Sequence, residues 1–448
     1  MTSRTLVACV GFFCFAITTT GNAEPTYACR ANGQAALVAY TQGNYDQVVK
    51  RLAPDVTSKG TADELKAGRS QLQGMAGDFR QLGDLQPRTI NGSNLLEADM
   101  VFSKRSVTAI VDCDAQDRIT TFKFVPADVP SSASAEAAMT TSATGIASAL
   151  NVTSPYGPLP GTLVLPKGKG PFSAVLLIVG SGPNDRDETV GPNKPFRDLA
   201  DGLAAAGVAT LRLDKRTSIY RADVSIDSNF TLDDEVTDDA LTALKQLATQ
   251  PSIDPKRVFV LGHSLGAFMA PRIGQRDPQL AGVIMMAAPT HFDIDLIIRQ
   301  MHRLAQMRGV SADQLNAQLA PLIKARDALA HADSAHPPAG NFLNAPASYW
   351  LSARDYDPVA TAKHLSEPLL ILQGGADFQV YPPEDFATWQ AAFAHDPRVK
   401  LIEYPGLSHL FMPAGNPPAP EDYFKPGHVD TRVIQDIADW IKAQPAHS

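Results

Sequence analysis

The stretch from Arg257 to Phe268, RVFVLGHSLGAF, constrains the fold of this 448-residue chain more than any other. An apolar run passes directly into GHSLG, residues 262–266, and continues with residues typical of a helix. Glycines at both ends of GHSLG fit a turn so tight that side chains there would collide with the backbone. G-x-S-x-G between a strand and a helix is typical of a turn that holds a serine hydroxyl above a sheet edge. We therefore expect Ser264 to be presented for chemistry; the alternative is a glycine-rich turn whose serine only caps the helix.

Strand and helix patterns alternate on both sides of this turn. Apolar runs typical of strands lie at 161–166, 172–180, 208–214, 257–262, 280–289, 368–377 and 399–406. Helical patterns lie at 196–207, 231–250, 383–394 and 431–443, and a helical insertion, expected as a cap over the site, lies at about 290–360. This alternation predicts an α/β fold with a mostly parallel sheet, whose active groups gather at the carboxyl ends of the strands.

The N-terminus has the pattern of a secretory signal peptide. Arg4 precedes the apolar segment LVACVGFFCFAI, and small residues lead up to a cleavage point after Ala23. A membrane anchor is the alternative, but the apolar run is shorter than the roughly 20 residues that a span needs. We expect residues 1–23 to be removed, the mature chain to lack a transmembrane segment, and the protein to reach the periplasm or the exterior.

A small α+β domain is expected at 24–128. Helical patterns at 31–54 and 61–79 come before short alternating segments at 87–128. This domain shows no convergent nucleophile, base and acid, so we assign it no chemistry. Ser-, Ala- and Thr-rich residues 129–150 are interpreted as a linker, whose later part also fits a weak helix or a continuation onto the next domain.

The expected catalytic domain then spans 151–448. Cys29 and Cys113 are the cysteines of the expected mature chain. In an exported protein, one such pair is a disulfide candidate, and two free buried thiols are the alternative.

Charge and composition limit the partners. The formal net charge is −8 and no basic block occurs, which argues against nucleic acid. The ten His and four Cys show no metal-ligand spacing, so we expect no metal and no other cofactor. The expected partner is a small-molecule acyl substrate.

A serine hydroxyl needs a base to take its proton and an acid to orient that base. With a serine on such a turn, the expected chain order is Ser, Asp or Glu, then His. Asp377 directly follows an apolar run and Gly374-Gly375, so it is the expected acid. Asp385 is interpreted as capping the next helix, and Asp355 and Asp357 precede the strand.

His409, in the loop after the last strand, is the expected base. His428 is its main rival, although a surface or capping role suits its place before the terminal helix. His291 is out of order for the base and is a candidate for lining the pocket. His263 adjoins Ser264, so its side chain should point away and pack in a second layer.

The oxyanion needs two backbone donors. We expect the N–H groups of Leu265 and Ser181, with Gly182 as the alternative to Ser181. Charged residues Asp185–Asp187 lie beside this loop, and Asp214–Arg216 end another strand. They either orient the substrate or form an internal salt-bridge network, and we favour the network.

Residues 151–445 resemble the α/β-hydrolase superfamily, most of all its bacterial esterase and dienelactone-hydrolase-like branch. The likeness rests on the GSGPNDRD loop, the GHSLG turn and the PGLSHLF loop, with YWLSARDYDP and FKPGHVD in support. The first domain is similar to a small cystatin-like domain of unknown function that often precedes such hydrolases. The resemblance implies Ser264, Asp377 and His409 as the catalytic triad.

One feature departs from the family pattern. Many relatives carry His-Gly before the oxyanion residue, where this chain has Val179-Gly180, so the backbone donor is kept and any help from the histidine is absent. In the insertion, Ile and Met at helical spacing fit either an adaptable apolar pocket or the packing of the cap itself. Tyr349 and Trp350 likewise fit either the acyl pocket or buried packing.

These patterns predict an exported serine hydrolase that cleaves carboxylic esters through an acyl-enzyme. A serine peptidase, aminopeptidase-like and of the same fold, is the alternative. A third hypothesis is a binding protein whose α+β domain recognises a ligand and whose hydrolase domain is auxiliary.

Overall fold

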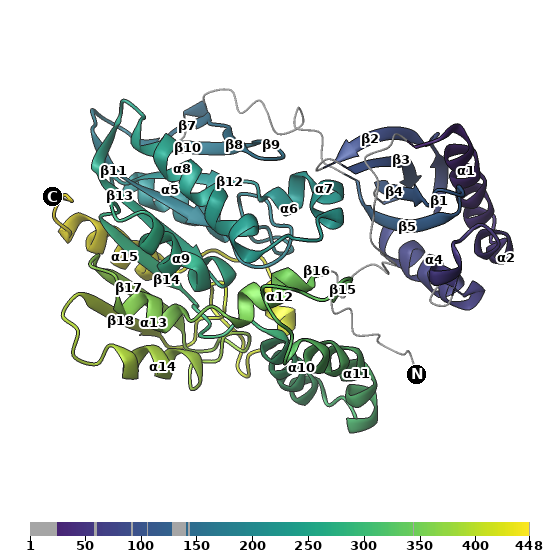
Figure 1. Ribbon diagram of the computed structural model, residues 1–448. Coiled ribbons are helices and arrows are strands. Elements are labelled where there is room, and N and C mark those ends of the chain that lie inside the picture. Colours follow the sequence, from purple (N-terminus) through teal and green to yellow (C-terminus); the bar gives the residue numbers. More distant parts are fainter. Residues whose placement is uncertain are drawn as a thin grey trace. The chain divides into compact units, whose positions relative to one another are not determined.

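The computed structural model describes residues 25–57, 61–90, 93–104, 106–127, 140–141, 144–343 and 345–447. The expected signal peptide and much of the expected linker lie outside these residues. The chain divides into two compact units, drawn in Figure 1. The first comprises Met1–Asp128, Tyr220–Phe230 and Leu329–Leu351, and the second comprises Val129–Ile219, Thr231–Ala328 and Ser352–Ser448.

The first unit contains the small α+β fold expected from the sequence. Its helices are α1 (Tyr27–Thr41), α2 (Tyr45–Val49), α3 (Pro54–Thr57) and α4 (Ala62–Ala76). Its antiparallel sheet has the order β1-β3-β4-β5, with β2 paired to β3. The strands are β1 (Phe79–Leu82), β2 (Gln86–Ile90), β3 (Ser93–Phe102), β4 (Ser106–Cys113) and β5 (Ile119–Pro126). Later segments add α7 (Arg221–Ile226) and the hairpin of β15 (Asn341–Phe342) and β16 (Ala345–Pro346).

A disulfide joins Cys29 on α1 to Cys113 on β4 and so fastens helix to sheet. The disulfide interpretation is therefore confirmed, and the alternative of two free thiols is wrong. Cys29 is buried in the core of this unit, where apolar side chains of α1 and β4 meet.

Replacing both cysteines with alanine should destabilise the first unit. The bond closes a loop of 84 residues, and such a loop restricts the unfolded chain by about 4.5 kcal/mol. Chemical denaturation of the wild-type protein and the double variant, followed by a probe in the first unit, measures this difference. A loss below about 1 kcal/mol would contradict the expectation.

The second unit is built on one large, mostly parallel sheet. Within the described residues, nine strands run in the order β18-β17-β14-β13-β11-β12-β10-β7-β6. Neighbours from β18 to β12 are parallel, whereas β10, β7 and β6 are added in antiparallel pairs. The strands are β6 (Thr140–Thr141), β7 (Gly145–Ala149), β10 (Gly161–Pro166), β11 (Phe172–Ile178), β12 (Ala209–Leu213), β13 (Ile253–His263), β14 (Gly282–Met286), β17 (Leu369–Gly374) and β18 (Val399–Tyr404).

Helices and short connections complete this unit. A small hairpin consists of β8 (Val152–Ser154) and β9 (Gly157–Leu159). The helices are α5 (Pro195–Ala205), α6 (Arg216–Ile219), α8 (Asp238–Ala248), α9 (Leu265–Arg276), α10 (Ile294–Arg308), α11 (Ala312–Leu329), α13 (Pro358–Lys363), α14 (Asp385–Ala392) and α15 (Thr431–Ala443). A π-helical turn at Asp233–Thr237 precedes α8, a 3-10 helix lies at Pro420–Phe424, and α12 (Ala347–Arg354) begins in the first unit and ends in the second.

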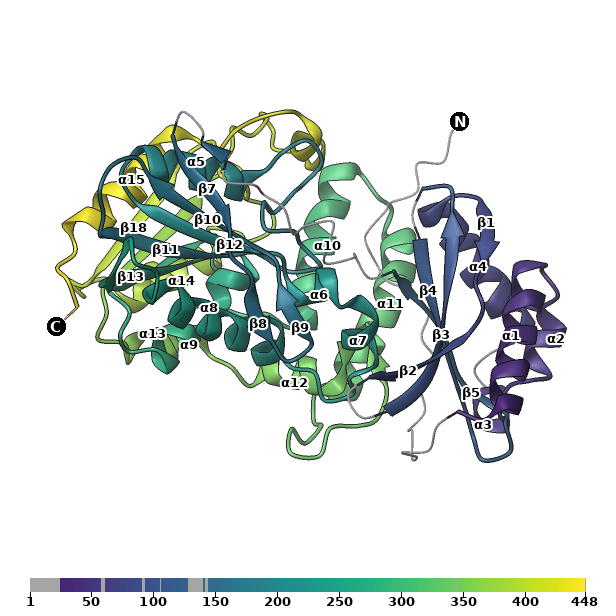
Figure 2. The same ribbon diagram turned by 90° about the horizontal axis from the view of Figure 1, so that it is seen from above.

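The core of the second unit lies against the sheet. Val433, Ile437 and Ile441 recur every four residues on α15, so that this face of the helix is buried. They join one apolar cluster with α5 and with the side chains of Val175 and Leu177 on β11. Helices α8 and α9 contact the sheet from its other face (Figure 2). The α/β fold class with a mostly parallel sheet is confirmed.

Residues 145–149 belong to the sheet, so of the interpretations considered for the later part of 129–150, continuation onto the next domain is the one that the structure shows. Strand β7 pairs with β10 from Thr162 to Pro166. Gly, Ala and Ser have low strand propensity, so composition gives no sign of this strand, and its position is set by pairing.

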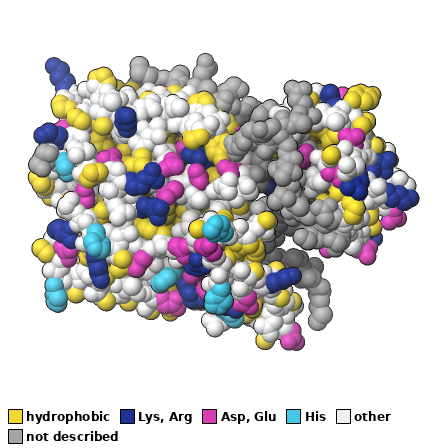
Figure 3. Space-filling model, in the orientation of Figure 1, with side chains coloured by type: hydrophobic (Ala, Val, Ile, Leu, Met, Phe, Trp, Pro, Cys, Tyr) yellow, Lys and Arg dark blue, Asp and Glu magenta, His cyan; other side chains and the backbone are white. Residues whose placement is uncertain are grey.

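Charged side chains of both signs are interspersed on the face of the molecule that Figure 3 shows, without a large basic patch among its described residues. Among the described helices, none is both long and apolar enough to span a bilayer.

Candidate active site

Ser264 lies at the turn between β13 and α9. Its backbone has φ 54° and ψ −116°, a conformation that costs energy for a residue with a side chain. A Cβ on Gly266 would lie 2.2 Å from the carbonyl oxygen of Ile178, and one on Gly262 would lie 2.1 Å from that of Gly266. Any side chain at either position would collide with the backbone, so both residues must be glycine. The Ser264 side chain makes no capping hydrogen bond to α9, which contradicts the interpretation of a serine that only caps.

Asp377 and His409 meet at the carboxyl end of the sheet. His409 Nδ1 lies 2.7 Å from Asp377 Oδ2, and both side chains are buried. The other carboxylate oxygen, Oδ1, accepts the N–H groups of Gln379 at 2.7 Å and Val380 at 3.0 Å. Because a carboxylate only accepts, Nδ1 carries the ring proton of neutral His409, and Nε2 is left with a lone pair.

The His409 loop lies against His263, the residue before Ser264. The rings of His263 and His409 have centroids 4.6 Å apart, and His263 Nε2 lies 2.9 Å from the backbone oxygen of His409. No hydrogen bond among the described residues joins Ser264 Oγ to His409. Catalytic hydrogen bonds are often long without a bound substrate and tighten when one binds.

His263 is paired with Glu188, a residue that the sequence did not single out. Its Nδ1 lies 2.9 Å from Glu188 Oε1, and both side chains are buried. The ring nitrogens thus face a carboxylate and a carbonyl, which are both acceptors, so the geometry favours the doubly protonated imidazolium. Burial alone would lower the pKa of His263, but Glu188 and the His409 carbonyl raise it above its ordinary value. Glu188 lies in a loop without periodicity, which is why no pattern marks it.

The raised pKa of His263 makes stability depend on pH. Glu188 and, at longer range, Asp377 favour the charged His263 ring in the folded state. The contribution of this ring to the free energy of unfolding is therefore complete below the unfolded pKa of about 6.5. It is lost as pH rises through the higher folded pKa. We expect wild-type unfolding free energy to exceed that of His263→Gln most strongly in acid, with a gap that narrows above about pH 6.5. Denaturant titrations of both proteins from pH 5 to 9 measure this, and a gap that widens with pH would contradict it.

The loop after β11 approaches the Ser264 turn. A Cβ on Gly180 would lie 2.9 Å from Glu188 Oε1 and 3.2 Å from Ser264 Cβ, so a side chain here would force its neighbours to shift. The Gly180 N–H donates to Glu188 Oε1 at 2.6 Å and is therefore not available to a substrate. Among the described residues, no hydrogen bond uses the N–H of Leu265 or of Ser181, the two predicted donors.

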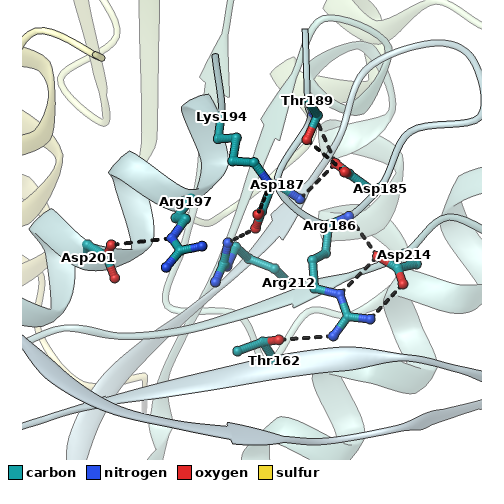
Figure 4. Close-up of polar contacts among 10 residues, drawn as sticks. All are labelled: Thr162, Asp185, Arg186, Asp187, Thr189, Lys194, Arg197, Asp201, Arg212 and Asp214. Carbon is teal, nitrogen blue, oxygen red and sulfur yellow. Dashed lines mark hydrogen bonds and ion pairs between the residues drawn. The ribbon is translucent and has the colours of Figure 1, made fainter. Parts of the chain in front are cut away.

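The charged residues beside this loop form an internal network (Figure 4). Arg186 makes paired contacts to Asp214, with its Nε 2.9 Å from Oδ1 and its Nη2 2.6 Å from Oδ2. Asp187 binds Arg212 and Lys194. The favoured interpretation, a salt-bridge network that holds the loop to β12, is confirmed.

The rival site residues have other partners. His428 is exposed and contacts Asp198, in keeping with the surface role considered for it. His291 is exposed, and its Nδ1 lies 3.2 Å from the hydroxyl of Thr290. Asp357 caps α13, and Asp355 pairs with Arg354.

The expectation that Asp385 caps α14 is wrong. Its carboxylate instead accepts the N–H and the hydroxyl of Thr290, at 2.8 and 2.9 Å. Asp385 is buried, so satisfying two donors from the β14 loop outweighs capping its own helix. Burial raises the pKa of Asp385.

The insertion is helical, and α10 borders the loop that carries Asp377. Gln300 Nε2 donates to the Gln379 backbone oxygen at 3.1 Å. Met301 on α10 is buried, whereas Met307 is partly exposed. Tyr349 and Trp350 take the packing role within the first unit: Tyr349 stacks on Phe230, and Trp350 Nε1 donates to the Phe342 backbone oxygen.

Three comparisons relate this chain to known proteins. The family model described as Serine aminopeptidase, S33, matches residues 194–413. Esterase EstD of Thermotoga maritima is 31% identical over 406 residues, which are 90% of this chain and 92% of that protein. Esterase FrsA of Klebsiella pneumoniae is 30% identical over 142 residues, 31% of each protein. Dienelactone hydrolase of Anabaena variabilis has a solved structure that covers 67% of this chain and 99% of its own, with 18% identity and a TM-score of 0.40.

A parallel sheet with a strained serine turn at the carboxyl end of one strand defines the class of the protein. Because the EstD relative matches nearly the whole chain, the chain belongs to the α/β-hydrolase superfamily. It is a hydrolase, as the sequence resemblance implied.

Proposed function

We propose that this protein is an exported serine esterase in which Ser264, His409 and Asp377 form the catalytic triad. The observation that carries the proposal is the buried 2.7 Å contact between His409 Nδ1 and Asp377 Oδ2. It leaves His409 Nε2 as a base in the loop whose backbone contacts the residue before Ser264.

The reaction follows from these roles. Ser264 Oγ attacks the acyl carbonyl while His409 Nε2 takes its proton, and the N–H groups of Leu265 and Ser181 bind the oxyanion. Collapse of the tetrahedral intermediate breaks the acyl–oxygen bond, and His409 returns the proton to the leaving alcohol. Water then attacks the acyl-enzyme by the same route and releases the acid. Asp377 keeps His409 in the required tautomer throughout.

An ester is the proposed substrate class because two relatives are named esterases, one of them over 90% of this chain. A peptidase is the second candidate because the matching family model is described as a serine aminopeptidase. Both reactions use the same groups, so the triad does not separate them.

Parallel assays test the choice. p-Nitrophenyl esters of several acyl lengths and aminoacyl-p-nitroanilides are offered to the wild-type protein, with Ser264→Ala as control. The proposal expects ester turnover that depends on Ser264. Turnover of the nitroanilides alone would replace it with the peptidase, and failure on both, with ligand binding by the full chain, would favour the binding protein.

Export is part of the proposal and rests on the pattern of residues 1–23. The Cys29–Cys113 disulfide supports it, because such bonds persist in oxidising compartments. N-terminal sequencing of protein recovered from the periplasm or medium of an expressing bacterium should begin at Glu24. Full-length protein that remains in the cytoplasm would contradict export.

A further inference from the structure

Buried charged side chains hold Gly180 on both sides. Its N–H donates to Glu188 Oε1 at 2.6 Å, and its carbonyl oxygen accepts Lys215 Nζ at 2.9 Å. Lys215 also pairs with Glu235 at 2.6 Å, and the side chains of this pair are each 5% exposed. A buried ion pair is costly to desolvate. Here the lysine of such a pair also donates to a single backbone carbonyl, which indicates that the position of this carbonyl matters.

Peptide geometry links this contact to the oxyanion. The Gly180 carbonyl and the Ser181 N–H belong to one planar, trans peptide unit, so they point in opposite directions. A group that fixes the carbonyl therefore fixes the direction of the N–H. Asn184 Nδ2 adds a second donor to the same carbonyl at 3.1 Å and reaches the Ser181 carbonyl at 2.9 Å.

Glu188 fixes the other end of Gly180 and ties it to the rest of the site. It accepts from Gly180 and from His263, whose other ring nitrogen contacts the His409 backbone. Glu188 also has a positive φ of 52°, so its backbone is held in a conformation that costs energy. One carboxylate thus connects the oxyanion loop, the Ser264 turn and the His409 loop.

We propose that Lys215 and Glu188 are positioning residues that aim the Ser181 N–H at the oxyanion formed on Ser264. They act through the two peptide units that meet at Gly180 and do not touch the substrate. The charged donor on the carbonyl also polarises the shared peptide, which strengthens the Ser181 N–H as a donor. This inference rests on the proposed function and extends it to residues that neither the motif nor the triad includes.

The test variant is Lys215→Met with Glu235→Gln, which removes both charges and leaves no unpaired buried carboxylate. Its matched control is Arg216→Met with Asp239→Asn, which removes the neighbouring buried ion pair, where the contact is 2.6 Å. Three quantities are measured: kcat and KM on a p-nitrophenyl ester, the inhibition constant of an arylboronic acid that forms a tetrahedral adduct, and the melting temperature.

The proposal expects kcat of the Lys215 variant to fall about 10- to 100-fold with KM within threefold, short of the ~10²–10³ that loss of a whole donor costs. Affinity for the boronic acid should fall by a similar factor. Lys215→Arg, which keeps a charged donor, should lose less kcat and less boronic acid affinity than the Lys215→Met, Glu235→Gln variant. The control should lose melting temperature to a similar degree while its kcat stays within threefold. A merely structural role of Lys215 would not weaken the tetrahedral adduct selectively.

Asn184→Ala provides a second route if the charge variant does not fold. It removes a neutral, half-buried donor from the same carbonyl, so kcat should fall about threefold to tenfold with KM unchanged. Folded variants at both positions with wild-type kcat and boronic acid affinity would overturn the proposal. Ester turnover that survives Ser264→Ala would instead refute the proposed function, and the positioning role with it.

Discussion

Ser264→Ala is expected to lower kcat on p-nitrophenyl esters by ~10⁴–10⁶-fold, to the level left by the oxyanion donors and substrate binding alone. The variant keeps the β13–α9 turn, since alanine differs from serine only by the missing hydroxyl. Binding of substrate should change little because the loss lies in the chemical step. Steady-state kinetics at saturating ester, with single-turnover measurements for the residual rate, give the value.

A matched control separates this loss from damage to the fold. Ser311, whose hydroxyl accepts a hydrogen bond at the start of α11, can be changed to alanine in the same way. Ser311→Ala should retain kcat within about twofold, and both variants should melt near the wild-type temperature. If Ser264→Ala retains more than about 10% of wild-type kcat, Ser264 is not the nucleophile.

Asp377→Asn should lower kcat by ~10⁴-fold, because it puts the proton of His409 on the wrong nitrogen. The oxygen of the new amide is expected at the Oδ1 position, because two N–H groups, of Gln379 and Val380, donate there at shorter distances than the single donor at Oδ2, Gln373 Nε2. The amide nitrogen then faces His409 Nδ1 and donates to it. Nδ1 must accept, Nε2 must carry the proton, and the base can no longer take the proton from Ser264.

Asp385→Asn is the matched control, because Asp385 is, like Asp377, a buried aspartate that follows β17. Its carboxylate contacts Thr290, so kcat should stay within about threefold of wild type even if stability falls. The reverse result, a large loss for Asp385→Asn and little for Asp377→Asn, would assign the acid to Asp385.

The sequence predicts most of this fold because its strands are continuous apolar runs between clear turn residues. The pairing of Asp377 with His409 was also predictable, since chain order and the position after a strand place both at one edge of the sheet. Strand β7 was hidden by its small residues, and the role of Asp385 depends on the distant Thr290. The role of Glu188 was not predictable, because loop conformation brings it to its partners, Gly180 and His263, and leaves no periodic pattern in the sequence.

The most direct test of the central claim is the site at which a fluorophosphonate reacts. A nucleophilic serine displaces fluoride and keeps the phosphonyl group, which mass spectrometry of the intact protein and its peptides detects. We expect a single adduct on the peptide that contains Ser264, loss of esterase activity in proportion to it, and no adduct in Ser264→Ala. An adduct on a different residue, or full ester turnover by wild-type protein whose Ser264 remains unlabelled after prolonged exposure, would contradict this expectation.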